Sequence, residues 1–107
     1  MATVLNITDR LKKEVKQIQI GDEVLTVNTA FEAMVELEAN QRMKIDDTEK
    51  MEKNLLLLLG EDYQKLKEMK LDLEDMKVVF IAIMATVNAC TYEEMEERFR
   101  TIEQQQQ

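Results

Sequence analysis

The sequence predicts a mainly helical α+β domain, with an N-terminal β-hairpin packed on a bundle of four or five short helices. Residues 15–28 alternate apolar and polar on either side of Gly21-Asp22, as two strands joined by a tight turn do. From residue 29 onward, apolar residues recur at helical spacing between capping residues. We expect one domain over residues 1–103 and a disordered tail over Gln104–Gln107, because that polar tail has nothing to bury.

The predicted hairpin places Ile18 and Ile20 on one face, with Leu25 and Val27 matching them across the turn. A hairpin alone is marginally stable in water, so this one should lie against helices. The first 14 residues fit either a frayed helix or an extra strand, marked by Val4, Leu5, Ile7 and Leu11.

The first two helices are predicted from their caps. Thr29-Ala-Phe-Glu32 has the form of a capping box, in which each side chain binds a free backbone N–H. Asp46-Asp47-Thr48 should begin the second helix, which carries Met51 and Leu55–Leu59 and stops at Gly60. The expected inner stripe of the first helix is Phe31, Met34, Val35 and Glu38, with Ala30 and Leu37 beside it.

Further helices follow along the chain. Residues 61–69 should form a short helix with Tyr63 and Leu66 inward, and Asp72 should cap the next helix. Thr91-Tyr-Glu-Glu94 repeats the capping box for the last helix, where Cys90 and Met95 have the spacing of a hydrophobic staple. Its expected inner stripe is Tyr92, Met95, Phe99 and Ile102.

The segment Leu73–Cys90 is apolar on two sides when projected as a helix. Its broad core face is Met76, Val79, Phe80, Ile83, Met84, Val87 and Cys90. The opposite flank is also apolar and mostly small, and it supplies the candidate partner-binding residues Val78, Ile81, Ala82, Ala85 and Ala89. Two interpretations stay open and both can apply in part: a central helix sandwiched inside the domain, or a surface on which a second copy or a client helix packs closely.

Composition argues against an enzyme. The chain has no His, Ser, Pro or Trp, and Cys90 is its single cysteine. A nucleophile activated by His, an imidazole metal site and a disulfide scaffold are therefore ruled out, and we expect Cys90 to be a buried, inert thiol. The carboxylates at Asp46-Asp47, Asp72–Asp75 and Glu93–Glu97 are interpreted as helix N-terminal acids, not metal ligands. We expect no catalytic, cofactor-binding or metal-binding residue.

The charge indicates protein partners. Twenty-two acidic against 14 basic residues give a net charge of −8, which repels phosphate backbones and anionic lipid. The locally basic stretch Arg10–Lys16 has no aromatic residue to stack a base, so we expect no nucleic-acid binding. The apolar run Val78–Val87 is far shorter than the ~20 residues of a membrane span. With no secretory signal and one cysteine, we expect the cytoplasm.

Eight methionines allow two interpretations. Met34, Met51, Met76 and Met95 fall on predicted inner stripes and read as core filler, whereas Met43 and Met69 are free to be exposed. Flexible thioether side chains also suit surfaces that bind varied apolar partners.

The order of these features resembles the tail assembly chaperones of long-tailed phages and prophages of Gram-positive bacteria. The features are a basic start (Ile7-Thr-Asp-Arg-Leu-Lys-Lys13), the hairpin Ile18–Asn28, a Thr-capped helix, Leu59-Gly60-Glu-Asp-Tyr-Gln-Lys-Leu66, an apolar helix and an acidic one. The likeness covers nearly the whole chain and lies in layout and size.

The resemblance implies a small protein of the host cytoplasm that coats the helical tape measure protein. The coat keeps that client soluble until tail tube subunits polymerise around it, so the tape measure protein and the tail tube protein are the expected partners. We also expect a homo-oligomer. The alternative is a structural adaptor or connector subunit retained in the phage particle, and an enzyme with a carboxylate-bound metal is a third and weaker hypothesis.

Overall fold

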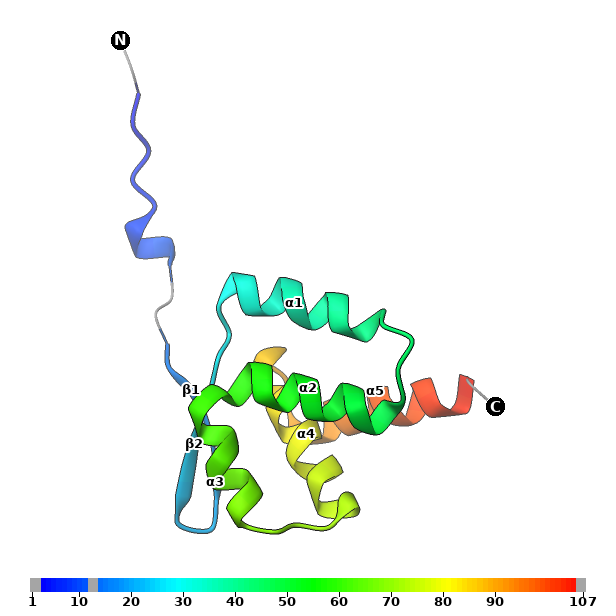
Figure 1. The fold of residues 1–107 in the computed structure, drawn as a ribbon. Helices are drawn as coiled ribbons and strands as arrows, with labels where there is room; N and C mark the ends of the chain where they lie inside the picture. The colour runs from blue at the N-terminus through cyan, green and yellow to red at the C-terminus, as the bar shows by residue number, and fades with distance from the viewer. Residues whose placement is uncertain (1–2, 12–13, 106–107) are drawn as a thin grey trace.

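The computed structural model describes residues 3–11 and 14–105, with side chains described up to Thr101. It confirms a mainly helical α+β fold in which a two-stranded antiparallel hairpin packs against helices (Figure 1). The elements in chain order are η1 (Thr8–Arg10), β1 (Lys16–Ile20), β2 (Glu23–Val27), α1 (Phe31–Gln41), α2 (Asp47–Leu59), η2 (Gly60–Asp62), α3 (Tyr63–Glu68), α4 (Leu73–Val87) and α5 (Tyr92–Gln105).

The hairpin forms as predicted, with Gly21-Asp22 as its turn. Ile18 pairs with Leu25, and Ile20 pairs with Glu23 across a two-residue turn. Gly21 opens that turn with φ of +61°, a conformation that favours glycine. Leu25 and Val27 are buried and Ile18 and Ile20 are half-buried against the same core, so the alternation in the sequence identified the inner face.

One core joins the hairpin to the helices. Leu25 of β2, Leu58 of α2, Leu66 of α3 and Ile83 of α4 are each 0% exposed. Ile83 lies in the C-terminal half of α4, which packs against both strands, α2 and α5. The predicted core face of α4 is confirmed by Val79, Phe80 and Ile83, and the predicted inward positions of α3 by Leu66 and the half-buried Tyr63.

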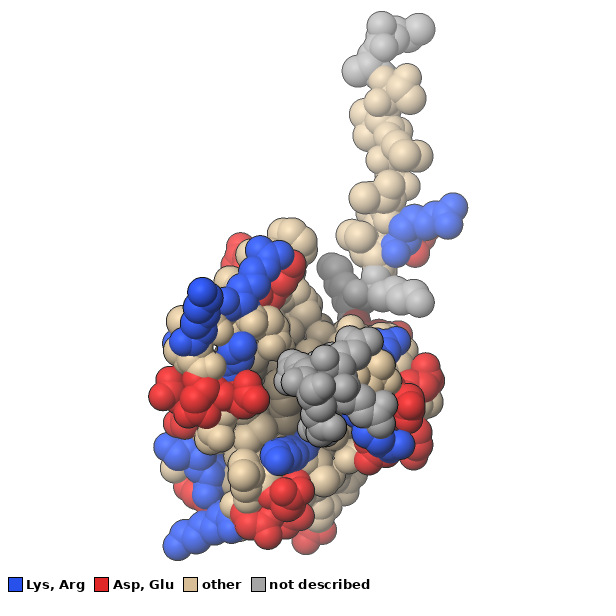
Figure 2. All heavy atoms as spheres, turned by 90° about the vertical axis from the view of Figure 1, so that its right-hand side faces the viewer, with Lys and Arg blue, Asp and Glu red and all other residues tan. Residues whose placement is uncertain are grey.

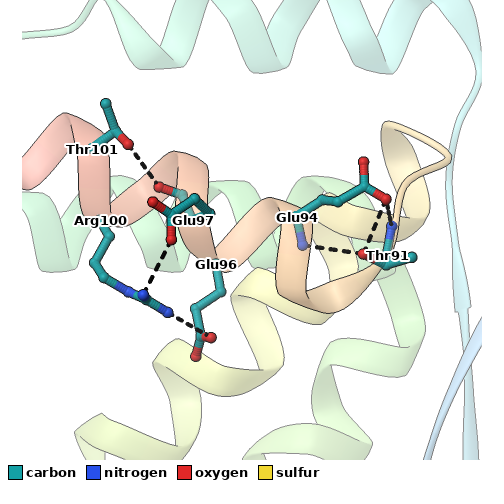
Figure 3. Close-up of polar contacts among 6 residues, drawn as sticks. All are labelled: Thr91, Glu94, Glu96, Glu97, Arg100 and Thr101. Atoms are coloured by element: carbon teal, nitrogen blue, oxygen red, sulfur yellow. Dashed lines mark hydrogen bonds and ion pairs between the residues drawn. The ribbon is translucent and has the colours of Figure 1, made fainter.

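Three of the predicted caps are present. The Asp46 carboxylate accepts a hydrogen bond from the Thr48 N–H at 2.8 Å, and Asp72 accepts one from the Asp75 N–H at 2.9 Å. Thr91 and Glu94 form the reciprocal capping box of α5, which Figure 3 shows: the Glu94 N–H donates to Thr91 Oγ1 at 3.1 Å and the Thr91 N–H donates to Glu94 Oε1 at 3.4 Å. α2 ends before Gly60, where φ is +54°.

The predicted capping box at Thr29 is wrong. α1 begins at Phe31, and its N-cap is Ala30, which has no side-chain acceptor to offer. Asn28 ends the strand instead: its N–H donates to the Leu58 carbonyl at 2.7 Å, and its Oδ1 accepts from the Ala30 N–H at 3.0 Å. These bonds hold residues 28–30 outside the helix, so Thr29 lies too early to cap it.

The predicted inner stripe of α1 is wrong at Phe31, Val35 and Glu38, whereas Met34 and the adjacent Leu37 pack in the core as predicted. Ala33, Leu37 and Asn40 are the buried residues, whereas Phe31 is 81% exposed and Val35 is 53% exposed. Ala30 and Glu38 are exposed as well, and Met34 is half-buried. The helix is therefore rotated so that its largest apolar side chain faces away from the core.

A buried amide pair accounts for that rotation. Asn40 of α1 donates from Nδ2 to Asn54 Oδ1 of α2 at 3.1 Å, and the two side chains are 9% and 1% exposed. A buried amide without a partner is costly, so this hydrogen bond fixes which side of α1 meets α2.

Substitution of Asn54 tests this pairing. Asn54→Ala leaves the Asn40 amide buried without its acceptor, and we expect a loss of about 2 kcal/mol in the free energy of unfolding. Asn40→Leu/Asn54→Leu removes both polar groups and should be less destabilised than the single variant. Urea unfolding of the two variants decides this, and a double variant at least as unstable as Asn54→Ala would contradict it.

A carboxylate ties the hairpin to α3. Asp62 Oδ2 accepts a hydrogen bond from the Thr26 backbone N–H at 2.8 Å, on the edge of β2 that faces away from β1. That hydrogen bond lowers the pKa of Asp62 from the ordinary 3.8 and outweighs the opposing effect of burial; Lys65, whose Nζ lies 3.6 Å from Oδ1, lowers the pKa further.

The lowered pKa of Asp62 determines how its contribution to the stability of the fold changes with pH. The ionised carboxylate stabilises the fold above its unfolded pKa, and this contribution is lost as the pH falls through the lower folded pKa. We therefore expect Asp62→Ala to lower the urea midpoint at pH 7 and to approach the wild-type midpoint as the pH falls below the ordinary carboxyl pKa of 3.8. A constant difference between the two proteins from pH 7 to pH 2 would contradict this role.

The two ends of the chain differ from the expectations in different ways. The described residues before the hairpin are irregular apart from η1, and they form neither of the two structures considered for them. α5 continues to Gln105, two residues into the expected tail, whereas Gln106 and Gln107 lie outside the described residues. Met95 of the α5 stripe is buried and Tyr92 and Phe99 are half-buried; the Ile102 side chain lies outside the described part.

Candidate functional site

The predicted partner-binding residues lie along α4 in a graded environment. Val78 is 50% exposed, Ile81 and Ala82 are half-buried, and Ala85 is only 5% exposed. The flank is therefore open at Val78, partly covered at Ile81 and Ala82, and covered by the chain itself at Ala85. Around Ala85, which belongs to the core, α4 is a central helix packed inside the domain. Around Val78 and Ile81, part of the helix surface remains accessible to a partner.

Ala89 lies beyond the helix instead of on its flank. It is exposed with φ of +53°, its N–H donates to the Thr86 carbonyl at 3.3 Å, and the Cys90 N–H donates to the Ala85 carbonyl at 3.0 Å. These two bonds are those of a Schellman motif, which ends a helix in a left-handed residue. Cys90, at the next position, is half-buried, whereas the sequence predicted a buried thiol.

The strain at Ala89 gives a direct test of this helix end. A residue with a Cβ is disfavoured in the left-handed region, so Ala89→Gly should stabilise the domain by about 0.5–1 kcal/mol. The matched control Ala82→Gly, inside α4, should destabilise it by about 1 kcal/mol. Thermal and urea unfolding measure both, and destabilisation of the same size at the two positions would show that Ala89 is not a helix stop.

A hollow lies where α4 meets the start of α2 and the middle of α5, and we call it the α2–α4–α5 hollow. Its volume is about 580 Å³. Apolar side chains from three helices line it, namely Met51, Leu73, Phe80, Ile81 and Phe99. Its polar lining is Gln41, Asp47, Thr48, Lys50, Asn54 and Lys77.

The wall of the hollow is built by packing between α4 and α5. The rings of Phe80 and Phe99 have centroids 6.0 Å apart and planes inclined by 55°, a favourable tilted arrangement. Leu73, at the start of α4, is 49% exposed beside the hollow. The lining is mixed, five apolar against six polar residues, and such a combination suits an amphipathic segment of another chain.

Sequence reasoning identified only part of this site. Ile81 is the one predicted partner-binding residue that lines the hollow, and Val78 is exposed outside its lining. Met51 and Phe99 come from other helices, and both were assigned to inner stripes. Their half-burial is a consequence of how α2, α4 and α5 cross, which a pattern within one helix does not reveal.

A second hollow of about 530 Å³ adjoins the hairpin. It is lined by Glu14–Lys16, by Thr26–Ala30 and by Leu57–Asp62. Its walls include the backbone of the strand end and the Asp62 carboxylate that holds Thr26, so it belongs to the junction between hairpin and helices.

Several acidic groups at the start and middle of α5 are engaged in a helix cap and in ion pairs. Residues 3–11 and 14–105 contain no group of three His, Cys, Asp or Glu side chains placed to hold a metal ion. Glu96 and Glu97 pair with Arg100 at 2.8 and 3.1 Å, and Glu94 is used in the cap (Figure 3). Burial raises the pKa of Tyr92, helped by Glu96 and Glu93, so this phenol stays neutral at pH 7.

Comparisons with known proteins add no relative. No protein-family model, no curated protein and no solved structure matches the chain. Among the described residues, no helix combines the length and apolar character that a membrane crossing requires.

Proposed function

We propose that this chain is a non-enzymatic phage tail assembly chaperone that binds and solubilises the tape measure protein in the host cytoplasm. The observation that carries the proposal is the α2–α4–α5 hollow, where a small acidic domain leaves apolar side chains of three helices open among polar ones. The layout of the sequence, which resembles that chaperone family, supplies the identity of the client.

The surface around the hollow fits a helical client. Ile81 and Phe99 offer apolar contacts, and Leu73 extends them along the start of α4. An amphipathic helix binds such a surface through apolar residues at every third or fourth position. Lys50 and Lys77 at the margin can meet acidic side chains on the outer side of that helix.

The net charge of −8 contributes to keeping the bound client soluble. A complex of an apolar client with many acidic subunits stays soluble because its outer surfaces repel one another. Tail tube subunits that displace the chaperone bury the same apolar residues of the client. Weak individual contacts suit this exchange, because each subunit must leave as the tube grows.

Co-expression of the chain with the tape measure protein tests the proposal. We expect the wild-type chain to keep that client in the soluble fraction. Ile81→Glu should lose most of this activity, because it places a charge in the hollow. Leu56→Glu, at a 55% exposed position of α2 outside the hollow, is the matched control and should act as wild type.

Circular dichroism must show that both variants remain folded, and equal solubilisation by all three proteins would overturn the assignment of the hollow. Failure of the wild-type chain to solubilise the client would overturn the proposed function. Mass spectrometry of purified particles separates the alternative: an adaptor subunit would be present in fixed copy number, and a chaperone absent.

A further inference from the structure

The N-terminal arm, residues 3–11, projects away from the domain (Figure 1). All its described side chains are exposed, and four of them are apolar: Val4 at 87%, Leu5 at 83%, Ile7 at 51% and Leu11 at 58%. Figure 2 shows the described part of the arm standing clear of the body. The described domain therefore provides no surface that covers the arm. Because apolar side chains in contact with water are unfavourable, a covering surface on another chain would stabilise them.

The spacing of these residues suits helical packing. Val4, Ile7 and Leu11 lie three and four residues apart, which places them on one side of a helix. The arm already contains one helical turn, η1 at Thr8–Arg10. As an α-helix, residues 4–11 would be about 12 Å long, and α1 with its 11 residues is about 16 Å long.

α1 presents a matching surface, which we call the α1 outer face. Phe31 and Val35 stand one turn apart and are strongly exposed, while the opposite side of α1 packs on α2. Glu32 and Glu36 flank them, and neither forms an ion pair with any residue that the structure describes. α1 contains three Glu and no Lys or Arg.

The charges of the arm and of α1 are complementary. Arg10 is exposed and forms no ion pair with the described residues, and the sequence adds Lys12 and Lys13 just after the arm. Residues 9–16 contain four basic residues against Asp9 and Glu14, whereas the rest of the chain has ten basic against 20 acidic residues. The arm carries Asp9 and Arg10, and the lysines that follow it in the sequence give residues 9–16 a net positive charge, which the acidic, apolar face of α1 attracts.

We infer that the arm of one copy docks on the α1 outer face of a second copy. The contact joins two different surfaces, so a pair of copies still has one unused arm and one unused α1 outer face. Further copies can bind at these surfaces, and the association continues head to tail into a ring or an open chain. The α2–α4–α5 hollow takes no part in it. The inference therefore stands apart from the proposed function and is tested with the full chain alone, without client.

Two variants separate the two surfaces. Val4→Asp/Ile7→Asp disables the arm and Phe31→Asp/Val35→Asp disables the face, and both change only exposed side chains, so thermal unfolding should stay close to wild type. By analytical ultracentrifugation we expect the wild-type chain to gain mass with concentration, and each variant alone to stay monomeric. Leu56→Asp, another exposed Leu, should associate as wild type.

Mixing the two variants gives the decisive result. An intact arm and an intact face are then present on different chains, so an equimolar mixture should form a heterodimer and nothing larger. A mixture that stays monomeric would overturn the inference, as would a monomeric wild-type chain, which is the result expected if the arm folds back on its own α1. Association of the arm variant alone would also overturn it, since two α1 faces would then be pairing.

Discussion

The fold depends on the burial of Ile83 in the C-terminal half of α4. Leu25, Leu58 and Leu66 close around the same core, so the hairpin, α2 and α3 are all held by contact with one apolar region. The hairpin needs this support because two strands alone are marginal in water. The Asp62 carboxylate adds a polar tie at the edge of β2, which sets the strand against α3. Removal of this core would release every element of the domain at once.

The same constraint explains why apolar surface is left over. A domain of this size has little interior relative to its surface, and here the interior is used up on one side of α4. α1 reaches the rest of the fold through α2, where Asn40 and Asn54 set its rotation, and its outer face stays in water. The start of α4 is likewise open around Leu73 and Val78. Both surfaces follow from the packing, and both are available to other chains.

The sequence predicted features that are decided locally. Strand alternation identified Leu25 and Val27, and the caps at Asp46, Asp72 and Thr91 were predicted because each depends on a few neighbouring residues. α1 was misjudged for two reasons that no local pattern contains. Its start is delayed by the bond from Asn28 to a carbonyl of α2, and its rotation follows a polar pair.

The candidate site was predicted in part for the same reason. Ile81 could be recognised from the apolar character of α4, whereas Met51 and Phe99 join it through the crossing of three helices. Ala85 was assigned to the surface because a helix apolar on both sides leaves open which side is covered. Phe31 was assigned to the core although it is exposed, because a large apolar residue on a short helix more often faces inward.

Site-specific photocrosslinking in cells that express the tape measure protein tests whether the exposed apolar side chains on the helices of this domain bind another chain. A photoreactive residue replacing Ile81 should form a covalent adduct identified by mass spectrometry as the tape measure protein. The same residue replacing Glu68, exposed on α3, should not. Equal adduct yields at the two positions, or none at Ile81 while the client stays soluble, would contradict the account.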